Sequence, residues 1–293
     1  MVRRSVGADR ARVLAALEWP EARDALTPTV YGKQLTGDDP RSDARHAAME
    51  ATAWQLRVLA GWLPPGRSGL ARLFAGPLEI ANIDQHLASV TGAREVVSPI
   101  GLGSLATASQ RVARATTPEI VRRTLAVSVW GDPGGADPAA VALGLRLGWA
   151  RRLAGQSPIL EPWAKGGAAV LIARERFAFD RTINESTGRV ADALLGMRWR
   201  AASSPSELAR VLPDVASWPL TGVEDSAALW QAESAVARRV AREAWALAMS
   251  ARPGRNAVIG IMASLLIDLR LVLAVIELAG RGAKPVEVFD AVA

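Results

Sequence analysis

The sequence is poor in several residue types on which catalysis often depends. It contains no cysteine, two histidines and one tyrosine in 293 residues. The lack of cysteine excludes disulfides, thiolate metal ligands and a cysteine nucleophile, and it fits a reducing compartment. The two histidines, His46 and His86, form neither a zinc-ligand pattern nor a triad pattern. We therefore expect no metal site and no cofactor.

The common sequence motifs of enzymes are missing as well. Neither Gly-x-Ser-x-Gly nor Ser-x-x-Lys occurs, and the glycine-containing turn at residues 101–104 lacks the Gly-Lys-Ser/Thr of a phosphate loop. Asp38 and Asp39 suggest a magnesium site of an all-α enzyme that acts on diphosphates. However, Pro40 makes Asp39 a helix N-cap, and no second acidic motif is present. We expect no catalytic activity.

Charge is the next property that limits the function. The chain has 35 Lys and Arg against 29 Asp and Glu, a net charge of +6, and nearly all of the positive charge is arginine. These arginines are spread along the chain without a run of five, which favours a solvated surface over a dedicated polyanion site. The N-terminal segment has no apolar stretch, so we expect no signal peptide and a cytoplasmic location.

Residues 256–280 form the longest apolar segment of the chain. Their length and spacing predict a helix that is apolar on nearly all sides. Asp268, Arg270 and Glu277 interrupt the segment, and one charge at mid-bilayer costs roughly 3 kcal/mol, so we predict a buried core helix and not a membrane span. No segment shows a convincing strand pattern. The predicted fold is all-α.

A set of features recurs three times along the chain. Leu26 is followed five residues later by Tyr31 and a glycine, Leu125 is followed in the same way by Trp130, and Leu212 precedes Trp218. Each set is followed by a long helical segment (41–62, 139–153 and 225–249) and then by an apolar one (70–92, 169–188 and 256–280). We predict three related three-helix bundles, at residues 1–97, 98–188 and 189–293, arranged as a funnel or collar. The recurring tryptophans are expected to fill equivalent gaps in the core.

Three polar residues stand out within the apolar segments. Glu79 and Asn82 lie three residues apart and so share a helix face, which is expected to be exposed surface. Asp268 lies inside the apolar helix at 256–280, where an unpaired carboxylate would cost several kcal/mol. It must therefore reach an arginine, water or another subunit.

The order of these features resembles the C subunit of V/A-type rotary ATPases, which is called d in eukaryotes. The resemblance rests on residues 26–32 (LTPTVYG), on residues 78–83 (LEIANI), where the family repeats a Glu/Asp-Ile-x-Asn segment, and on residues 269–271 (LRL). The turn and short helix at 282–288 are also similar to the family's ending. The resemblance extends over nearly the whole chain.

The resemblance implies a non-catalytic central-stalk subunit that couples the rotating stalk to the proteolipid rotor ring and so transmits torque for ATP-linked ion transport. Such a protein would be peripheral at the cytoplasmic face of the membrane and would bind no nucleic acid. The matching positions, which are candidate partner contacts, are Glu79, Asn82, Asp180, Arg181, Asp268 and Arg270. Leu271 replaces the family's asparagine in the third copy, and Asp180 matches only loosely in the second. The alternative is an arginine-rich helical nucleic-acid-binding or adaptor module.

Overall fold

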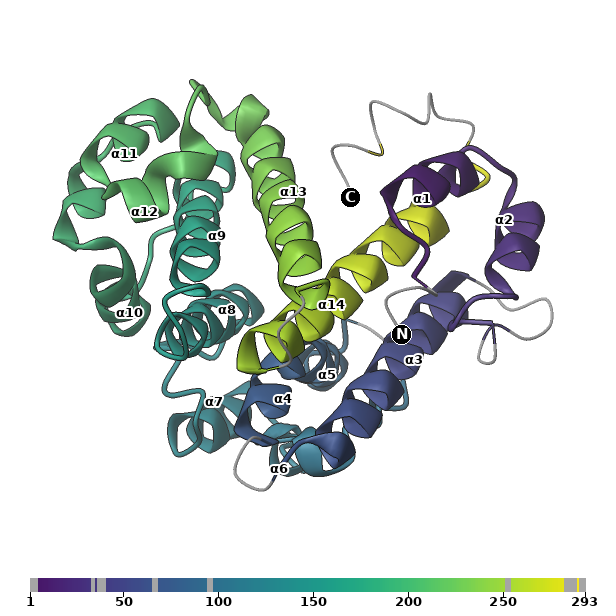
Figure 1. The fold of residues 1–293 in the computed structure, drawn as a ribbon. Coiled ribbons are helices and arrows are strands. Elements are labelled where there is room, and N and C mark those ends of the chain that lie inside the picture. Colours follow the sequence, from purple (N-terminus) through teal and green to yellow (C-terminus); the bar gives the residue numbers. More distant parts are fainter. Residues whose placement is uncertain are drawn as a thin grey trace. The chain divides into compact units, whose positions relative to one another are not determined.

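The computed structural model describes residues 5–32, 35, 41–64, 68–93, 97–250, 254–281 and 289. Within these residues every regular element is a helix and no strand occurs (Figure 1). The predicted all-α class is confirmed. Asp38, Asp39 and the turn at 282–288 lie outside the described residues.

The chain forms two compact units. The first comprises Met1–Phe74, Ile100–Gly103 and Ala237–Ala293, and the second comprises Ala75–Pro99 and Ser104–Val236. The boundary near residue 236 falls within helix α13 (Leu229–Ala248). These units do not coincide with the segments 1–97, 98–188 and 189–293, so the division into three bundles stays a prediction.

The first unit is built around α14 (Arg255–Leu278). This helix packs against α1 (Ala8–Ala15), α2 (Trp19–Leu26), α3 (Arg41–Trp62) and α4 (Ser68–Phe74) (Figure 1). By length and hydropathy α14 could cross a membrane, but 67% of its most apolar window is buried within the structure. Its contacts with four helices agree with the predicted core helix.

The second unit is built around α8 (Pro138–Ala154), which packs against α5 (Gly76–Val90), α9 (Glu161–Ala173) and α10 (Glu185–Leu195). Buried aliphatic side chains of α5 and α8 share a core with Leu125 and Trp130. The remaining elements of this unit are α6 (Ser109–Val112), α7 (Pro118–Ala126), α11 (Pro205–Val211), α12 (Asp214–Ser217) and several single turns.

Four helix starts in the second unit follow the capping rules. The side chains of Thr117, Asp137, Asn184 and Ser204 each accept a hydrogen bond from a backbone N–H in the first turn of the helix that follows. Proline occupies the first turn of three of these helices, where its missing N–H costs nothing. These local signals explain why the starts of α7, α8 and α11 were predictable.

Two predicted helices differ from the structure. The segment at 70–92 is divided at Ala75 into α4 and α5. The predicted helix at 169–188 is wrong, because α9 passes into a π-helical segment, η3 (Arg174–Ala178), and a non-helical stretch follows. Asp180 there has a φ of 48°, which a continuing right-handed helix does not allow.

The tryptophans are less uniformly buried than predicted. Trp130, Trp163 and Trp199 are core residues. In contrast, four tryptophans on the long helices are exposed, namely Trp54, Trp62, Trp230 and Trp245. The expectation that all of them fill the core is therefore wrong for α3 and α13.

The first two copies of the recurring sequence form the same turn. The Thr29 hydroxyl donates to the Leu26 carbonyl (2.5 Å) and accepts from the Tyr31 N–H (3.3 Å). Ser128, in the same way, bridges the Leu125 carbonyl (2.7 Å) and the Trp130 N–H (3.1 Å). The third copy differs, because Leu212 is extended and leads into α12.

Candidate functional site

Glu79 is buried, which corrects the expectation that it is exposed surface. Its side chain projects from α5 with only 1% of the residue exposed. The carboxylate accepts hydrogen bonds from the backbone N–H groups of Thr107 (2.7 Å), Ala108 (2.6 Å) and Ser109 (2.9 Å), and from the Thr107 hydroxyl (2.6 Å). Glu79 thereby satisfies the N–H groups that precede and open α6, which have no partner within the helix.

Trp130 and Arg152 complete the surroundings of this carboxylate. The Trp130 indole N–H donates to the Thr107 hydroxyl (3.1 Å), and the Arg152 guanidinium lies 4.1 Å from the centre of the Trp130 ring. Burial lowers the pKa of Arg152, while the attraction of Glu79 opposes that change. The charge of Glu79 is thus balanced by a nearby cation as well as by N–H donors.

Asp268 has a comparable arrangement in the first unit. It lies in the middle of α14, buried, and accepts hydrogen bonds from the N–H groups of Val6 (2.7 Å) and Gly7 (3.1 Å) and from the Tyr31 hydroxyl (2.9 Å). Burial raises the pKa of Asp268, and the three hydrogen bonds oppose this change. Burial and the nearby Asp268 carboxylate raise the pKa of Tyr31 well above its usual value. The described partners are two N–H groups and a phenol, and none of the arginine, water or second subunit that the sequence suggested.

We call these two arrangements the carboxylate joints. In each, an acid of a long buried helix accepts hydrogen bonds from backbone N–H groups just before a short helix, α6 or α1. In each, the aromatic residue that ends the recurring turn reaches the same cluster, directly for Tyr31 and through Thr107 for Trp130. The joints relate distant parts of the chain, which sequence spacing alone did not reveal.

Two other predicted residues, Asn82 and Arg270, lie on the same helices as Glu79 and Asp268. Asn82 lies one turn after Glu79 on α5 and is buried, which corrects the expectation that it is exposed surface. Arg270 is half-buried two residues after Asp268 on α14. The structure thus places four of the six predicted residues on the two joint helices, in different units. Neither Glu79 nor Asp268 presents an open surface to a partner.

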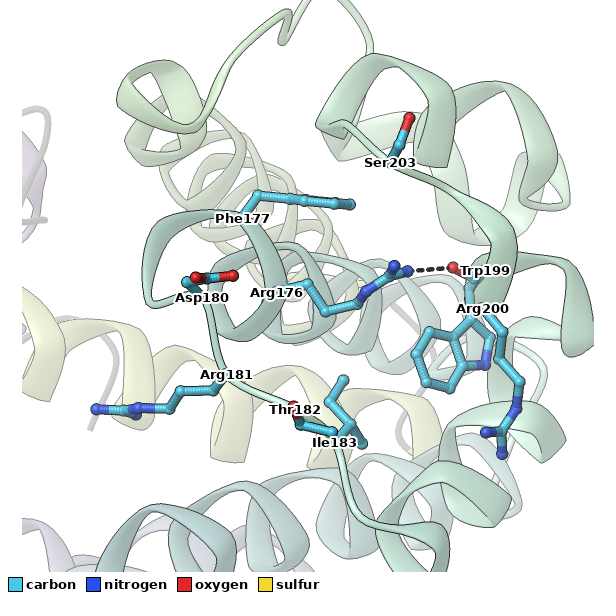
Figure 2. A pocket seen from close by; sticks show the side chains of 9 residues that line it. All are labelled: Arg176, Phe177, Asp180, Arg181, Thr182, Ile183, Trp199, Arg200 and Ser203. Atoms are coloured by element: carbon cyan, nitrogen blue, oxygen red, sulfur yellow. Dashed lines mark hydrogen bonds between the residues drawn. The ribbon is translucent and has the colours of Figure 1, made fainter.

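Asp180 and Arg181 lie elsewhere, on the wall of a pocket of about 470 Å³ (Figure 2). Both are exposed, and Arg181 forms an ion pair with Glu175 (3.3 Å). Asp180 therefore does not take the place in the second copy that Glu79 takes in the first. Arg176, on the same pocket wall, donates from its guanidinium to the Trp199 carbonyl (2.6 Å).

A second hollow, of about 390 Å³, runs between α5, α8 and α9. We call it the α5 groove. Small residues and two tryptophans form most of its lining, and an ion pair between Asp84 and Arg146 (2.8 Å) lies at its polar part. From α5 the lining residues are Pro77, Ile80, Ala81 and Asp84, which share one helix face. Glu79 projects from the opposite side of the same helix.

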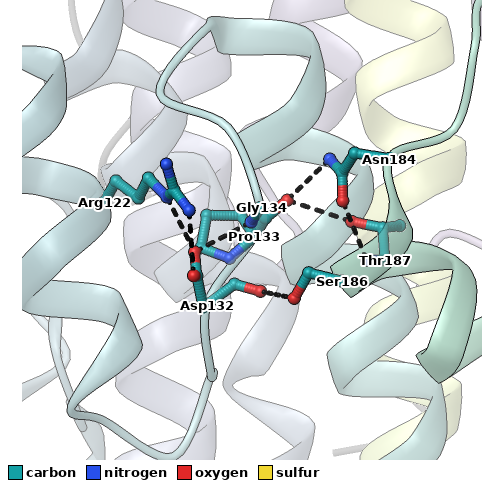
Figure 3. A network of polar contacts seen from close by, with 7 residues as sticks. All are labelled: Arg122, Asp132, Pro133, Gly134, Asn184, Ser186 and Thr187. Atoms are coloured by element: carbon teal, nitrogen blue, oxygen red, sulfur yellow. Dashed lines mark hydrogen bonds and ion pairs between the residues drawn. The ribbon is translucent and has the colours of Figure 1, made fainter.

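A polar network that sequence reasoning missed joins the loop before α8 to the start of α10 (Figure 3). Arg122 binds Asp132 through two hydrogen bonds (2.8 and 3.0 Å), which with the Gly134 N–H lower the pKa of Asp132. The Pro133 carbonyl accepts from the side chains of Asn184 (2.9 Å) and Thr187 (3.0 Å). This network is a brace between segments about 50 residues apart.

Within the described ranges no three His, Asp or Glu side chains gather in a way that could hold a metal ion. The chain matches no model of a known protein family and no curated protein.

Proposed function

We propose that this protein is a non-catalytic central-stalk subunit of a V/A-type rotary ATPase, which couples the rotating stalk to the proteolipid rotor ring. The observation that carries the proposal is the position of α5. The segment of α5 that resembles the family's repeated motif contributes Glu79 to a carboxylate joint on one side and lines the α5 groove on the other. One side of α5 thus takes part in internal hydrogen bonds, and the other side faces the groove.

The carboxylate joints suit a part that transmits torque. A buried carboxylate that accepts three or four hydrogen bonds holds its donors firmly. Separating them costs about 1–3 kcal/mol for each donor left without a partner. Glu79 fixes α5 to the start of α6, and Asp268 fixes α14 to the start of α1. Such links keep helices from sliding under load.

The α5 groove suits a helix of a central-stalk subunit. Its small residues, Ala81, Ala150, Ala164 and Gly167, leave space that a large apolar side chain of a partner can fill. The half-buried Trp149 offers apolar contact area at the wall of the groove. The Asp84 and Arg146 pair supplies polar contacts beside the apolar surface, the usual arrangement of a protein interface.

The test is recovery of partners by the tagged full-length chain from membranes of its own cell. We expect both stalk subunits and the proteolipid ring to co-purify with the unaltered protein. Ala81→Arg places a long charged side chain in the α5 groove and should release the stalk subunits while the ring is retained. Ala126→Arg, at an exposed position at the end of α7, is the matched control and should change nothing.

Two results would contradict the proposal. Recovery of the unaltered chain without either partner would remove the assembly role. Equal recovery of stalk subunits by both arginine variants, each with an unchanged helix signal, would remove the groove as their site.

A further inference from the structure

The pocket beside the π-helical segment η3 contains an arginine that its surroundings hold in place (Figure 2). Arg176 extends across the pocket and donates to the Trp199 carbonyl (2.6 Å). Its guanidinium also lies 5.2 Å from the Phe177 ring centre and 5.8 Å from that of Trp199. The Trp199 ring is itself fixed, because its N–H donates to Asp192 (2.9 Å).

The charge of Arg176 is not matched by a carboxylate. Arg181 pairs with Glu175 (3.3 Å) and Arg200 with Asp192 (2.8 Å), so the other two arginines of the pocket are neutralised. Among the described residues no carboxylate lies within ion-pair distance of Arg176. Its pKa is lowered by burial, which is the expected result for a partly desolvated cation without an anionic neighbour. The guanidinium remains charged at neutral pH.

Further donors lie along the same wall. In the described part of the chain, neither the Thr182 hydroxyl nor the backbone N–H groups of Thr182 and Ile183 have a protein partner. An arginine has five N–H donors in a planar fork that matches an oxyanion, and Arg176 uses one on Trp199. The pocket therefore offers a preoriented cation and several donors.

We propose that this pocket binds an oxyanion, either a carboxylate or a phosphate group, on the guanidinium of Arg176. This site is separate from the α5 groove, and it does not depend on the assembly role proposed above. Asp180, on the same wall, opposes the ligand by like-charge repulsion and limits its affinity.

The experiment uses the purified full-length chain, with inorganic phosphate and acetate as separate probes at constant ionic strength. Binding is followed by the ¹⁵N shifts of arginine Nε groups. We expect saturable binding of at least one probe in roughly the millimolar range. Arg176→Gln should weaken it by about tenfold or more, because a charge-assisted pair is lost. Arg123→Gln, which removes an equal charge from an exposed position on α7, should leave it unchanged.

Asp180→Asn tests the same proposal with the opposite sign. Asparagine tolerates the left-handed backbone found at this position, so the variant should fold normally. Removal of the opposing charge should tighten binding by about two- to fivefold. Saturation by phosphate alone identifies a phosphate-bearing ligand, and saturation by acetate alone identifies an acidic side chain. Failure of both probes to saturate, or equal affinity of the Arg176→Gln and Arg123→Gln variants, would overturn the proposal.

Discussion

The carboxylate of Asp268 allows the sharpest test of how the first unit is held together. Its three hydrogen bonds connect the middle of α14 to Val6 and Gly7 before α1, and to Tyr31 after α2. Two substitutions separate the role of the acceptor oxygens from the role of the charge. Asp268→Ala removes the acceptors, and Asp268→Asn retains one of them at nearly the same volume.

The expected losses follow from the geometry. Asp268→Ala removes the carboxylate acceptor of two N–H groups and a phenol, of which the Val6 N–H and the Tyr31 hydroxyl are buried and the Gly7 N–H is partly buried, at about 1–3 kcal/mol each. Removal of the buried carboxylate recovers part of its desolvation cost, so we expect a net loss of about 3 kcal/mol in the free energy of unfolding. Asp268→Asn should cost about 1–2 kcal/mol, since one oxygen still accepts.

The measurements are urea unfolding followed by circular dichroism, and hydrogen exchange at the Val6 and Gly7 amides. Exchange at both amides should accelerate in Asp268→Ala and remain slow in Asp268→Asn. Asp9→Asn, at a fully exposed aspartate of α1, is the control and should stay within about 0.5 kcal/mol of the unaltered protein. A loss below about 1 kcal/mol in Asp268→Ala, with amide exchange unchanged, would refute the reasoning.

The pKa of Asp268 adds a dependence on pH with a definite sign. Burial raises this pKa above 3.8, so the folded protein binds the proton more tightly than the unfolded chain. The contribution of this group to stability is therefore largest at low pH and declines as pH rises from 3.8 through the folded pKa. In Asp268→Asn this decline should vanish, which a comparison of unfolding free energies across the acid range will show.

Three further predictions concern other parts of the fold. Glu79→Gln should cost about 1–2 kcal/mol in urea unfolding, because the amide oxygen can still accept from the three backbone N–H groups, while the amide nitrogen replaces the oxygen that accepts from the Thr107 hydroxyl; a neutral result would contradict the joint in the second unit. Burial and the neighbouring carboxylate raise the pKa of Tyr31, so its contribution to stability is present below pH 10.0 and is lost as pH rises through the folded pKa; Tyr31→Phe should flatten that alkaline loss, and an unchanged profile would argue against it. Gly166→Ala places a methyl group 2.7 Å from the Trp218 ring and should lower stability by about 1–3 kcal/mol, whereas Gly167→Ala, with open space around it, should be neutral or stabilising; equal thermal midpoints for the two would contradict this packing.

Much of the helical framework could be predicted from local signals. Helical periodicity, together with proline and capping residues at the starts, placed α3, α8 and α14 close to their observed bounds. The division at Ala75 was missed although Pro77 stands in the first turn of α5. The end of α9 was missed because no glycine or proline marks it in the sequence, and the contact of Arg176 with the Trp199 carbonyl spans 23 residues, which local spacing does not show.

The candidate sites were predicted less well, for a physical reason. Sequence spacing indicates which side chains share a helix face, but it does not indicate what that face meets. Glu79 was expected on the surface because the groups that donate hydrogen bonds to its carboxylate, at Thr107 to Ser109, lie about 30 residues further along the chain. Asp268 was correctly expected to need a partner, since an unpaired buried carboxylate is too costly, but its partners lie more than 200 residues away.

That separation has a consequence for biosynthesis. Gly7 and Asp268 are 261 positions apart, and at about 5–20 residues per second the ribosome needs on the order of tens of seconds to pass from one to the other. During this interval all residues of the second unit are translated. Helices α1, α2 and α3 are already made, but α14, against which they pack, is not. In a nascent chain halted before α14, the apolar faces of those three helices would remain exposed. Such faces are surfaces to which a chaperone can bind.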